Sequence, residues 1–342
     1  MSKARQFVRN TGFNLLGQLG VAVIGFFVTP YLVHRMGIET YALYVLLYAT
    51  AGYLSLLSFG ASAATIKYTA QFHAARNRGG LRDILFYAGS THLLGALLGA
   101  AVVAGAARFW AFRLFHVPAP LLDLAAWVLC AAALGAVFTA LIQFSSAVLQ
   151  GLHRFDWQAG LSLLQNGLMP LGAAVLISRG LGLGGVAVWY VLLQAVICLV
   201  IFAVVWKLLR PARDFRNGEG LSFRKFAAFS ISSWLVPVAS IANSQLDKTL
   251  IVRTVSLIDL TLYSVPAGLL QRLQTLPATI SSVLLPMMSE IHGPDAHERL
   301  LRMYLKSSRF LLWIVLPFLV INIATLLLFT YVLAISMVLL GK

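Results

Sequence analysis

Nine long apolar stretches alternate with short polar intervals along the chain. They cover residues 12–33, 41–66, 84–107, 121–149, 159–178, 185–206, 227–252, 261–289 and 310–341. A helix needs roughly 20 apolar residues to cross the hydrocarbon core of a bilayer, which is about 30 Å thick, so each stretch is long enough to span a membrane. The pattern therefore predicts an all-α polytopic membrane protein with about nine transmembrane helices.

Four of the stretches carry polar and small residues at alternating steps of three and four. Such steps stay on one side of an α-helix, so each of these helices is expected to carry a polar stripe. Small residues also let helices pack closely in a bilayer, so close packing and a polar cavity are both open readings. The stripes are Asn14, Gln18, Gly25 and Thr29; Tyr41, Tyr44, Tyr48, Ala51, Ser55, Ser58, Ser62 and Thr65; Ser233, Pro237, Ser240, Ser244 and Asp247; and Ser264, Gly268, Arg272, Thr275, Thr279 and Ser282.

Three ionisable residues fall inside the last two of these striped stretches. Arg272 lies near the middle of 261–289, whereas Asp247 and Lys248 lie in the second half of 227–252, next to Gln245. A charge at the centre of a spanning helix costs about 2.5–3.5 kcal/mol on insertion scales, and such residues usually serve a function. One reading is an internal ion pair of Asp247 with Arg272 or Lys248 that orders the bundle. The other is a hydrated cavity in which Arg272 attracts an anion and Asp247 takes up and releases a proton.

Other polar residues inside the stretches favour a structural role. His92 could titrate, although a lone histidine is more often packed and hydrogen-bonded. Gln143, Gln165 and Asn166 are expected to make hydrogen bonds between helices.

Composition supports a membrane protein and argues against two soluble classes. Of the 342 residues, 60% are hydrophobic and only 11% are charged, whereas a soluble domain carries about 25% charged residues. The net charge is +15, but the basic residues do not cluster on one polar face as in a nucleic-acid-binding protein. Neither a soluble enzyme nor a nucleic acid as partner is expected.

The distribution of basic residues predicts the orientation. If the N-terminus is cytoplasmic, the cytoplasmic intervals contain 18 of the 26 Lys and Arg residues and the outer intervals contain 6. Lys248 and Arg272 lie within spans. Because cytoplasmic loops are enriched in Lys and Arg, this asymmetry favours a cytoplasmic N-terminus.

The interval 207–226 predicts a division of the chain. It is the longest and most charged connection and contains Pro211, Gly218 and Gly220 as breakers. We expect a first six-helix lobe at 1–206, a cytoplasmic linker at 207–226, and an incomplete second lobe of three helices at 227–342. An offset of about 220 residues aligns the first two spans with the seventh and eighth by position, and repeated halves are common in transporters.

A search for catalytic motifs is mostly negative. The chain has no Gly-x-x-x-x-Gly-Lys-Ser/Thr phosphate loop, and the predicted outer loops are short and hold no paired carboxylates. Cys130 and Cys198 have no Cys or His at metal-ligand spacing. We therefore expect no catalytic residue, metal or cofactor. A membrane enzyme that polymerises or ligates lipid-linked sugars is the alternative from another class, but it would be expected to need a substantial outer loop.

Four segments resemble a known family. They are 29–44 (TPYLVHRMGIETYALY), 59–68 (FGASAATIKY), 149–156 (LQGLHRFD) and 245–252 (QLDKTLIV), the last followed by Tyr263 and Leu285-Pro286. They are similar to the polysaccharide flippases of the multidrug/oligosaccharidyl-lipid/polysaccharide exporter superfamily. The resemblance covers essentially the whole chain.

Three departures from the family pattern qualify this resemblance. Ser58 stands where the family often has an acid, so a coupling role for an acid at that position does not carry over. Ala42 replaces a glycine that follows the tyrosine. The family has at least twelve spans in two lobes, so we expect a truncated or altered C-terminus here.

The resemblance implies transport of a polyprenyl-diphosphate-linked oligosaccharide from the cytoplasmic to the periplasmic leaflet of the bacterial inner membrane, for surface polysaccharide synthesis. Possible partners are the polysaccharide polymerase and the chain-length machinery. Asp247 is the candidate ion coupler. The candidate substrate-binding residues are Arg272, Lys248, Gln18, Asn14, Gln245 and Ser240. A drug or cation antiporter of the same superfamily is an alternative, but it would prefer more intramembrane acids than Asp247 alone.

Overall fold

The computed structural model describes residues 20–21, 23–210, 212, 216, 218–254, 258–264 and 267, and eight positions between 301 and 320. The chain divides into two compact units, one of which is Val23–Val265. The other comprises Met1–Ala22 and Pro266–Lys342. The unit Val23–Val265 holds nearly all of the described residues.

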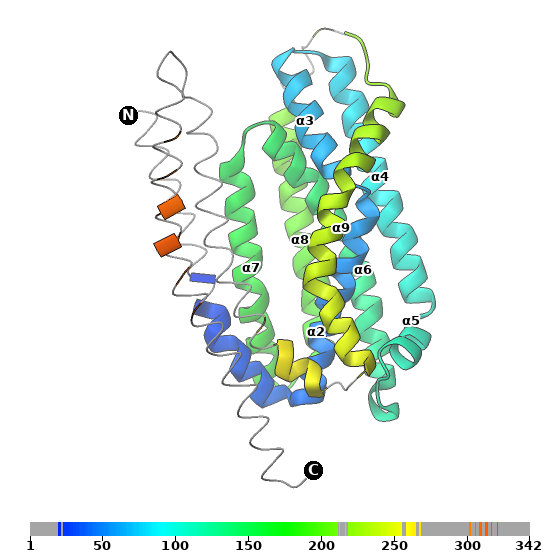
Figure 1. Ribbon diagram of the computed structural model, residues 1–342, viewed down its shortest axis with the longest axis vertical. Helices are drawn as coiled ribbons and strands as arrows, with labels where there is room; N and C mark the ends of the chain where they lie inside the picture. Colours follow the sequence, from blue (N-terminus) through cyan, green and yellow to red (C-terminus); the bar gives the residue numbers. More distant parts are fainter. Residues whose placement is uncertain are drawn as a thin grey trace. The chain divides into compact units, whose positions relative to one another are not determined.

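This unit is built from helices that run up and down along one long axis (Figure 1). Residues 23–36, at the start of this unit's sequence, and residues 258–264, at its end, are helical. The elements between them, in chain order, are α2 (Ile38–Leu54), the 3₁₀-helix η1 (Ser55–Ser58), α3 (Ala61–Ala74), α4 (Arg78–Gly105), α5 (Ala107–Phe109), the π-helical η2 (Trp110–Leu114), the 3₁₀-helix η3 (Ala119–Leu121), α6 (Leu122–Gly151), α7 (Phe155–Ser178), α8 (Gly182–Leu209) and α9 (Phe223–Thr254).

Five helical segments among the described residues are long and apolar enough to cross a membrane. They are Ile38–Ser58, Arg78–Gly105, Ala119–Gly151, Phe155–Ser178 and Gly182–Leu209. They overlap the second to sixth stretches predicted from the sequence, which confirms an all-α polytopic membrane protein. The predicted seventh stretch lies in α9, which is one helix of 32 residues but is more polar than those five. The total of nine spans stays a prediction, because part of 12–33 and most of 261–289 and 310–341 lie outside the described residues.

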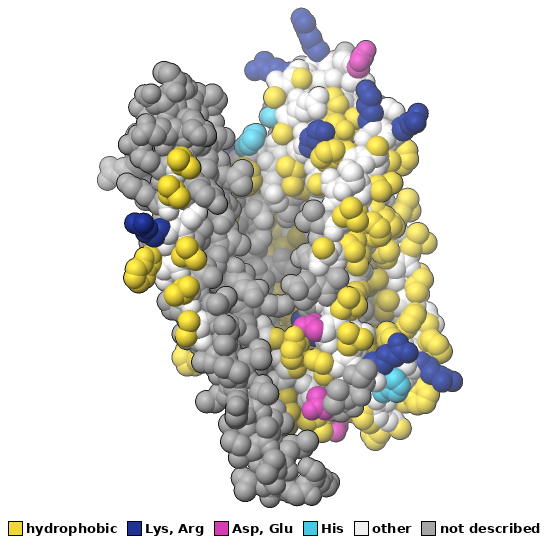
Figure 2. Space-filling model, viewed as in Figure 1, with side chains coloured by type: hydrophobic (Ala, Val, Ile, Leu, Met, Phe, Trp, Pro, Cys, Tyr) yellow, Lys and Arg dark blue, Asp and Glu magenta, His cyan; other side chains and the backbone are white. Residues whose placement is uncertain are grey.

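Helix α6 forms the centre of the unit and packs against α2, α3, α4, α7 and α8. Half of its residues are fully buried, and many of these are alanines that let the neighbouring helices approach closely. Large apolar side chains such as Leu98 on α4 and Leu199 on α8 point outward and are about 70% exposed. Figure 2 shows apolar side chains along the length of the unit and most charged ones toward its two ends. This is the surface expected of a bundle surrounded by lipid.

The predicted second stretch, 41–66, is not one continuous helix. Phe59 and Gly60 both adopt positive φ angles, 47° and 72°, and separate η1 from α3. Such angles are common for glycine but strained for phenylalanine. The polar stripe predicted for this stretch is therefore divided, with its tyrosines on α2 and with Ser62 and Thr65 on α3.

Helices α4 and α9 pack closely against this break. A Cβ atom on Gly60 would lie 2.2 Å from the carbonyl oxygen of Ser230 on α9, and one on Gly95 of α4 would lie 2.1 Å from the carbonyl oxygen of Leu57. The Leu56 carbonyl accepts hydrogen bonds from the Phe59 N–H at 3.1 Å and the Trp234 indole N–H at 2.8 Å. The break is thus stabilised by contacts with α4 and α9, which are far away in the sequence.

A second set of contacts fixes the connection between α8 and α9. The Arg78 N–H donates to the Arg216 carbonyl at 2.9 Å, the Asn77 amide donates to the Glu219 carbonyl at 2.8 Å, and the Leu221 N–H donates to the Asp83 carboxylate at 2.9 Å. Part of the predicted linker is therefore bound to the turn between α3 and α4. The compact unit continues through α9 to Val265, whereas the predicted lobes 1–206 and 227–342 remain a prediction.

We predict that Gly60→Ala destabilises the protein by about 1–3 kcal/mol, because the new methyl group would meet the Ser230 carbonyl at a strained φ. The measurement is the thermal melting temperature of the purified protein in detergent. Gly167→Ala on α7 is the matched control, since nothing lies within 4 Å of its Cβ position. Equal melting temperatures for the two variants would contradict the prediction.

Candidate functional site

Basic side chains gather at one end of the unit, which we call the basic end (Figure 2). The antiparallel helices bring together there the turns after α3 and α6 and the connection after α8. The described basic residues toward this end are Lys67, Arg76, Arg78, Arg82, Arg154, Lys207, Arg210, Arg216, Arg224 and Lys225. Those at the opposite end are Arg35, Arg108, Arg113, Arg179 and Arg253. The asymmetry agrees with the predicted cytoplasmic position of the basic end, which stays a prediction.

A cluster of polar side chains lies on the half of α9 away from the basic end. We call it the α9 polar cluster; its members are Tyr53, Gln245, Asp247, Lys248, Thr249 and Tyr263. They come from α2, from α9, and from the helical residues 258–264. Three of the residues predicted from the sequence, Gln245, Asp247 and Lys248, therefore lie together in the folded chain.

The Asp247 carboxylate accepts two hydrogen bonds. One of its oxygens accepts from the backbone N–H of Lys248 at 2.7 Å, and the other accepts from the hydroxyl of Tyr263. Tyr263 lies 16 residues further along the chain, in the helical residues 258–264. A carboxylate held by a tyrosine hydroxyl can exchange this partner for a proton or a cation, because neither hydrogen bond neutralises its charge.

Lys248 is half-buried and does not pair with Asp247. Its ammonium donates to the Gln245 side-chain oxygen at 3.3 Å, and no carboxylate oxygen lies within 4.0 Å of it among the described residues. The one ion pair in the described part of the chain joins Arg108 and Asp123 at the surface. An internal Asp247–Lys248 pair is therefore not formed, whereas a pair of Asp247 with Arg272 stays a prediction, because Arg272 lies outside the described residues.

Contacts with α2 hold the cluster in place. The Tyr53 and Thr249 hydroxyls are 2.8 Å apart, and a Cβ atom on Gly52 would lie 3.1 Å from the Gln245 amide nitrogen. The Thr261 hydroxyl donates to the Ile38 carbonyl at 2.7 Å and ties the helical residues 258–264 to the start of α2. Sequence reasoning missed Tyr53 and Thr249, because neither lies on a predicted polar stripe.

Four predicted site residues lie wholly or in part outside the described structure. Asn14, Gln18 and Arg272 lie outside the described residues. Ser240 lies on α9, but its side chain is also outside the described part. Their assignment to the site remains a prediction.

Two other polar groups have the structural roles expected from the sequence. His92 is fully buried; one ring nitrogen lies 3.0 Å from the Ser62 hydroxyl and the other 2.8 Å from the Ala88 carbonyl oxygen. The Gln165 amide donates to the side-chain oxygen of Gln194 on α8 at 2.6 Å. Both groups join neighbouring helices.

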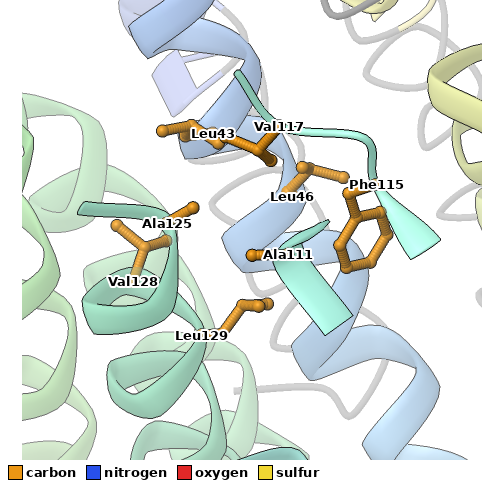
Figure 3. A pocket seen from close by; sticks show the side chains of 8 residues that line it. All are labelled: Leu43, Leu46, Ala111, Phe115, Val117, Ala125, Val128 and Leu129. Carbon is orange, nitrogen blue, oxygen red and sulfur yellow. The ribbon is translucent and has the colours of Figure 1, made fainter. Parts of the chain in front are cut away.

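A small pocket between α2, η2 and α6 has no polar lining (Figure 3). Its walls are the side chains of Leu43, Leu46, Ala111, Phe115, Val117, Ala125, Val128 and Leu129. With no hydrogen-bonding group on its walls, it is a packing gap and not a site for a polar ligand. The described residues also contain no group of three or more His, Cys, Asp or Glu side chains that could hold a metal ion.

The long apolar helices define a class of protein, the polytopic membrane proteins. Solved structures of several membrane transporters share this fold. A MATE transporter in complex with MaD3S has a TM-score of 0.65 at 16% identity, over 92% of this chain and 72% of that one. An inward-facing multidrug resistance MATE family transporter of the MOP superfamily has a TM-score of 0.62 at 16% identity, over 92% and 74%. A MOP superfamily transporter from Pyrococcus furiosus, described as having a binding pocket of reverse polarity, has a TM-score of 0.53 at 15% identity, over 87% and 74%.

The particular family follows from the sequence. The profile of the polysaccharide biosynthesis protein family matches residues 7–292, so the chain belongs to this family. No curated protein matches the sequence. Family and fold together identify a multi-pass membrane transporter and not an enzyme, and its environment is a lipid bilayer.

We predict that the Tyr53–Thr249 hydrogen bond couples α2 to α9 by about 0.5–1.5 kcal/mol. The measurement is a double-mutant cycle of melting temperatures with Tyr53→Phe, Thr249→Val and the double variant. The two single effects should not add, because either substitution already removes the bond. Tyr31→Phe with Thr249→Val is the control pair and should be additive; additivity in both pairs would contradict the prediction.

Proposed function

We propose that the protein is a flippase that moves a polyprenyl-diphosphate-linked oligosaccharide across the bacterial inner membrane for the synthesis of a surface polysaccharide. The observation that carries the proposal is Lys248, a half-buried cation on α9 that pairs with no carboxylate among the described residues. A charge in this position is costly unless a ligand or water compensates it. The diphosphate of a lipid carrier is an anion that can do so, and membership of the polysaccharide biosynthesis family supports this choice.

Each candidate residue has a role suited to its chemistry. Lys248 and Arg272 bind the diphosphate, because cationic donors make strong, charge-assisted hydrogen bonds to phosphate oxygens. Neutral donors and acceptors suit sugar hydroxyls; these are Gln245, Ser240, Asn14 and Gln18. The lipid tail stays in the bilayer while the headgroup crosses in a polar cavity, and the transporter alternates between opening to either side.

Asp247 couples transport to an ion gradient. Its carboxylate is bound by the Tyr263 hydroxyl and a backbone N–H, and it is not neutralised by Lys248. It can therefore gain and lose a proton or a monovalent cation as the surroundings change. The polysaccharide polymerase and the chain-length machinery would receive the product on the far side of the membrane.

A drug or cation antiporter of the same superfamily is the second candidate, since the solved structures of similar fold include multidrug transporters. An organic cation would be repelled by Lys248 and would find only Asp247 as a counter-charge in the α9 polar cluster. Because Asp247 and Lys248 carry opposite charges, the preference for an anionic substrate rests on Arg272 as the second cation proposed for the site.

We predict that Lys248→Gln lowers the transport of a radiolabelled lipid-linked oligosaccharide in reconstituted vesicles at least about tenfold, because one charge-assisted contact to the diphosphate is lost. Arg253→Gln is the matched control: Arg253 is also a basic residue of α9 but is exposed near the end of the helix. Its transport should stay within about twofold of the unmodified protein. Transport unaffected by Lys248→Gln would remove Lys248 from the mechanism, and a change in product length would indicate an enzyme instead of a flippase.

We predict that Asp247→Asn abolishes transport driven by an imposed gradient, tested separately for protons and for sodium, while exchange of lipid-linked sugar between leaflets at zero gradient continues. The physical reason is that an amide keeps the shape of the side chain but cannot carry the charge that a coupling ion neutralises. Gradient-driven transport that persists in Asp247→Asn would exclude Asp247 as the coupler.

A further inference from the structure

A second cation is held in a defined place at the contact between α3 and α9. The Lys67 side chain of α3 is exposed, and its ammonium lies 4.0 Å from the ring centroid of Phe229 on α9. The same ammonium lies 5.0 Å from the ring centroid of Tyr68. The faces of two aromatic rings attract a cation and restrict where a flexible lysine can go. Lys67 is therefore a positioned charge.

This charge is not used in an ion pair of the described structure. No carboxylate oxygen of the described residues lies within 4.0 Å of the Lys67 ammonium, because the single ion pair there is Arg108–Asp123. The contact of α3 with α9 also does not depend on the lysine. It is maintained by the close approach of Gly60 to Ser230 and by the rings of Tyr68 and Phe229, whose centroids are 5.9 Å apart. An exposed cation remains that can bind an anion.

Lys67 lies at a depth along the bundle at which it could contact a lipid headgroup. Lys67 lies seven residues before the end of α3 at Ala74, which corresponds to about 10 Å of helix. Lys248 lies six residues before the end of α9 at Thr254, or about 9 Å. Both cations are thus about equally far from the helix ends, at opposite ends of the unit.

The separation of the two cations matches the thickness of a membrane. From Phe229, which contacts Lys67, to Lys248 there are 19 residues of α9, or about 28 Å of helix. The hydrocarbon core of a bilayer is about 30 Å thick. In the sequence, the polar stripe of Ser233, Pro237, Ser240, Ser244 and Asp247 lies between these two positions.

We infer that Lys67 is a second binding site for a diphosphate ester, at the leaflet of the basic end, from which the headgroup begins its path to Lys248. The inference rests on the proposed function and extends it by naming where the substrate is first bound. The shared chemistry is the diphosphate group. A lipid carrier and free inorganic diphosphate both contain it, so the experiment must distinguish them.

The test measures binding of radiolabelled, sugar-free polyprenyl diphosphate to the full chain in phosphatidylcholine nanodiscs. All variants carry Lys248→Gln, so that binding at the other end of α9 does not mask the result. In this background Lys67→Gln should weaken binding at least about tenfold, and Lys67→Arg should retain it within about threefold, because arginine keeps the charge. Arg82→Gln, an exposed basic residue at the same end, is the matched control and should stay within about twofold.

Three results would overturn the inference. The first is an equal effect of Lys67→Gln and Arg82→Gln on binding. Binding would then depend only on the overall positive charge of the basic end. The second is competition by inorganic diphosphate as strong as that of the lipid, and the third is equal competition by phosphatidylglycerol. Because binding is measured without transport, loss of binding in Lys67→Gln supports this site even if the vesicle assay finds no flippase activity. Conversely, normal transport with no effect of Lys67→Gln rejects this site alone.

Discussion

At Gly60 the backbone of the α2–α3 break lies against the backbone of α9, with no room for a side chain between them. The Trp234 indole donates to the Leu56 carbonyl, which also accepts from the Phe59 N–H within the break. The close backbone contact and this hydrogen bond tie the break to α9, so the break and α9 stabilise each other. This contact fixes the position of α9. It thereby places the Phe229 ring, which contacts Lys67 of α3, and the α9 polar cluster near the other end of the helix.

Once α9 is fixed against α2 and α3, its polar side chains have few partners to choose from. Thr249 and Gln245 face α2. Thr249 is hydrogen-bonded to Tyr53, and Gln245 packs against Gly52. Asp247 is bound by Tyr263 from the next helical segment, and Lys248 is bound only by a neutral amide. The helix contacts thus satisfy the hydrogen bonds of the cluster but form no ion pair between its described charges. A half-buried charge without an ion pair is costly as a structural element, which supports the proposed role in binding or coupling.

The sequence was sufficient for those features that depend on local composition. Apolar length predicted the spans, and the rarity of charges inside them was enough to single out Asp247 and Lys248. The sequence was not sufficient for features that are determined by contacts between residues far apart in the chain. The stretch 41–66 is apolar and regular enough for one helix, and only contacts with α4 and α9 stabilise the break at Phe59 and Gly60. The partner of Asp247 is Tyr263, which lies 16 residues away in the sequence, in a later helical segment.

The charges of the site also distinguish the two proposed kinds of transporter, the flippase and the drug or cation antiporter. The solved structures of similar fold establish the helix arrangement but not the substrate, because their identity to this chain is 15–17%. Substrate choice has to come from the charges that the arrangement leaves free. Toward each end of the unit, α9 is accompanied by a lysine that pairs with no described carboxylate, and these lysines are about one hydrocarbon thickness apart. A cationic drug gains nothing from either lysine, whereas an anionic headgroup that starts in one leaflet and ends in the other would meet one at each end of its path.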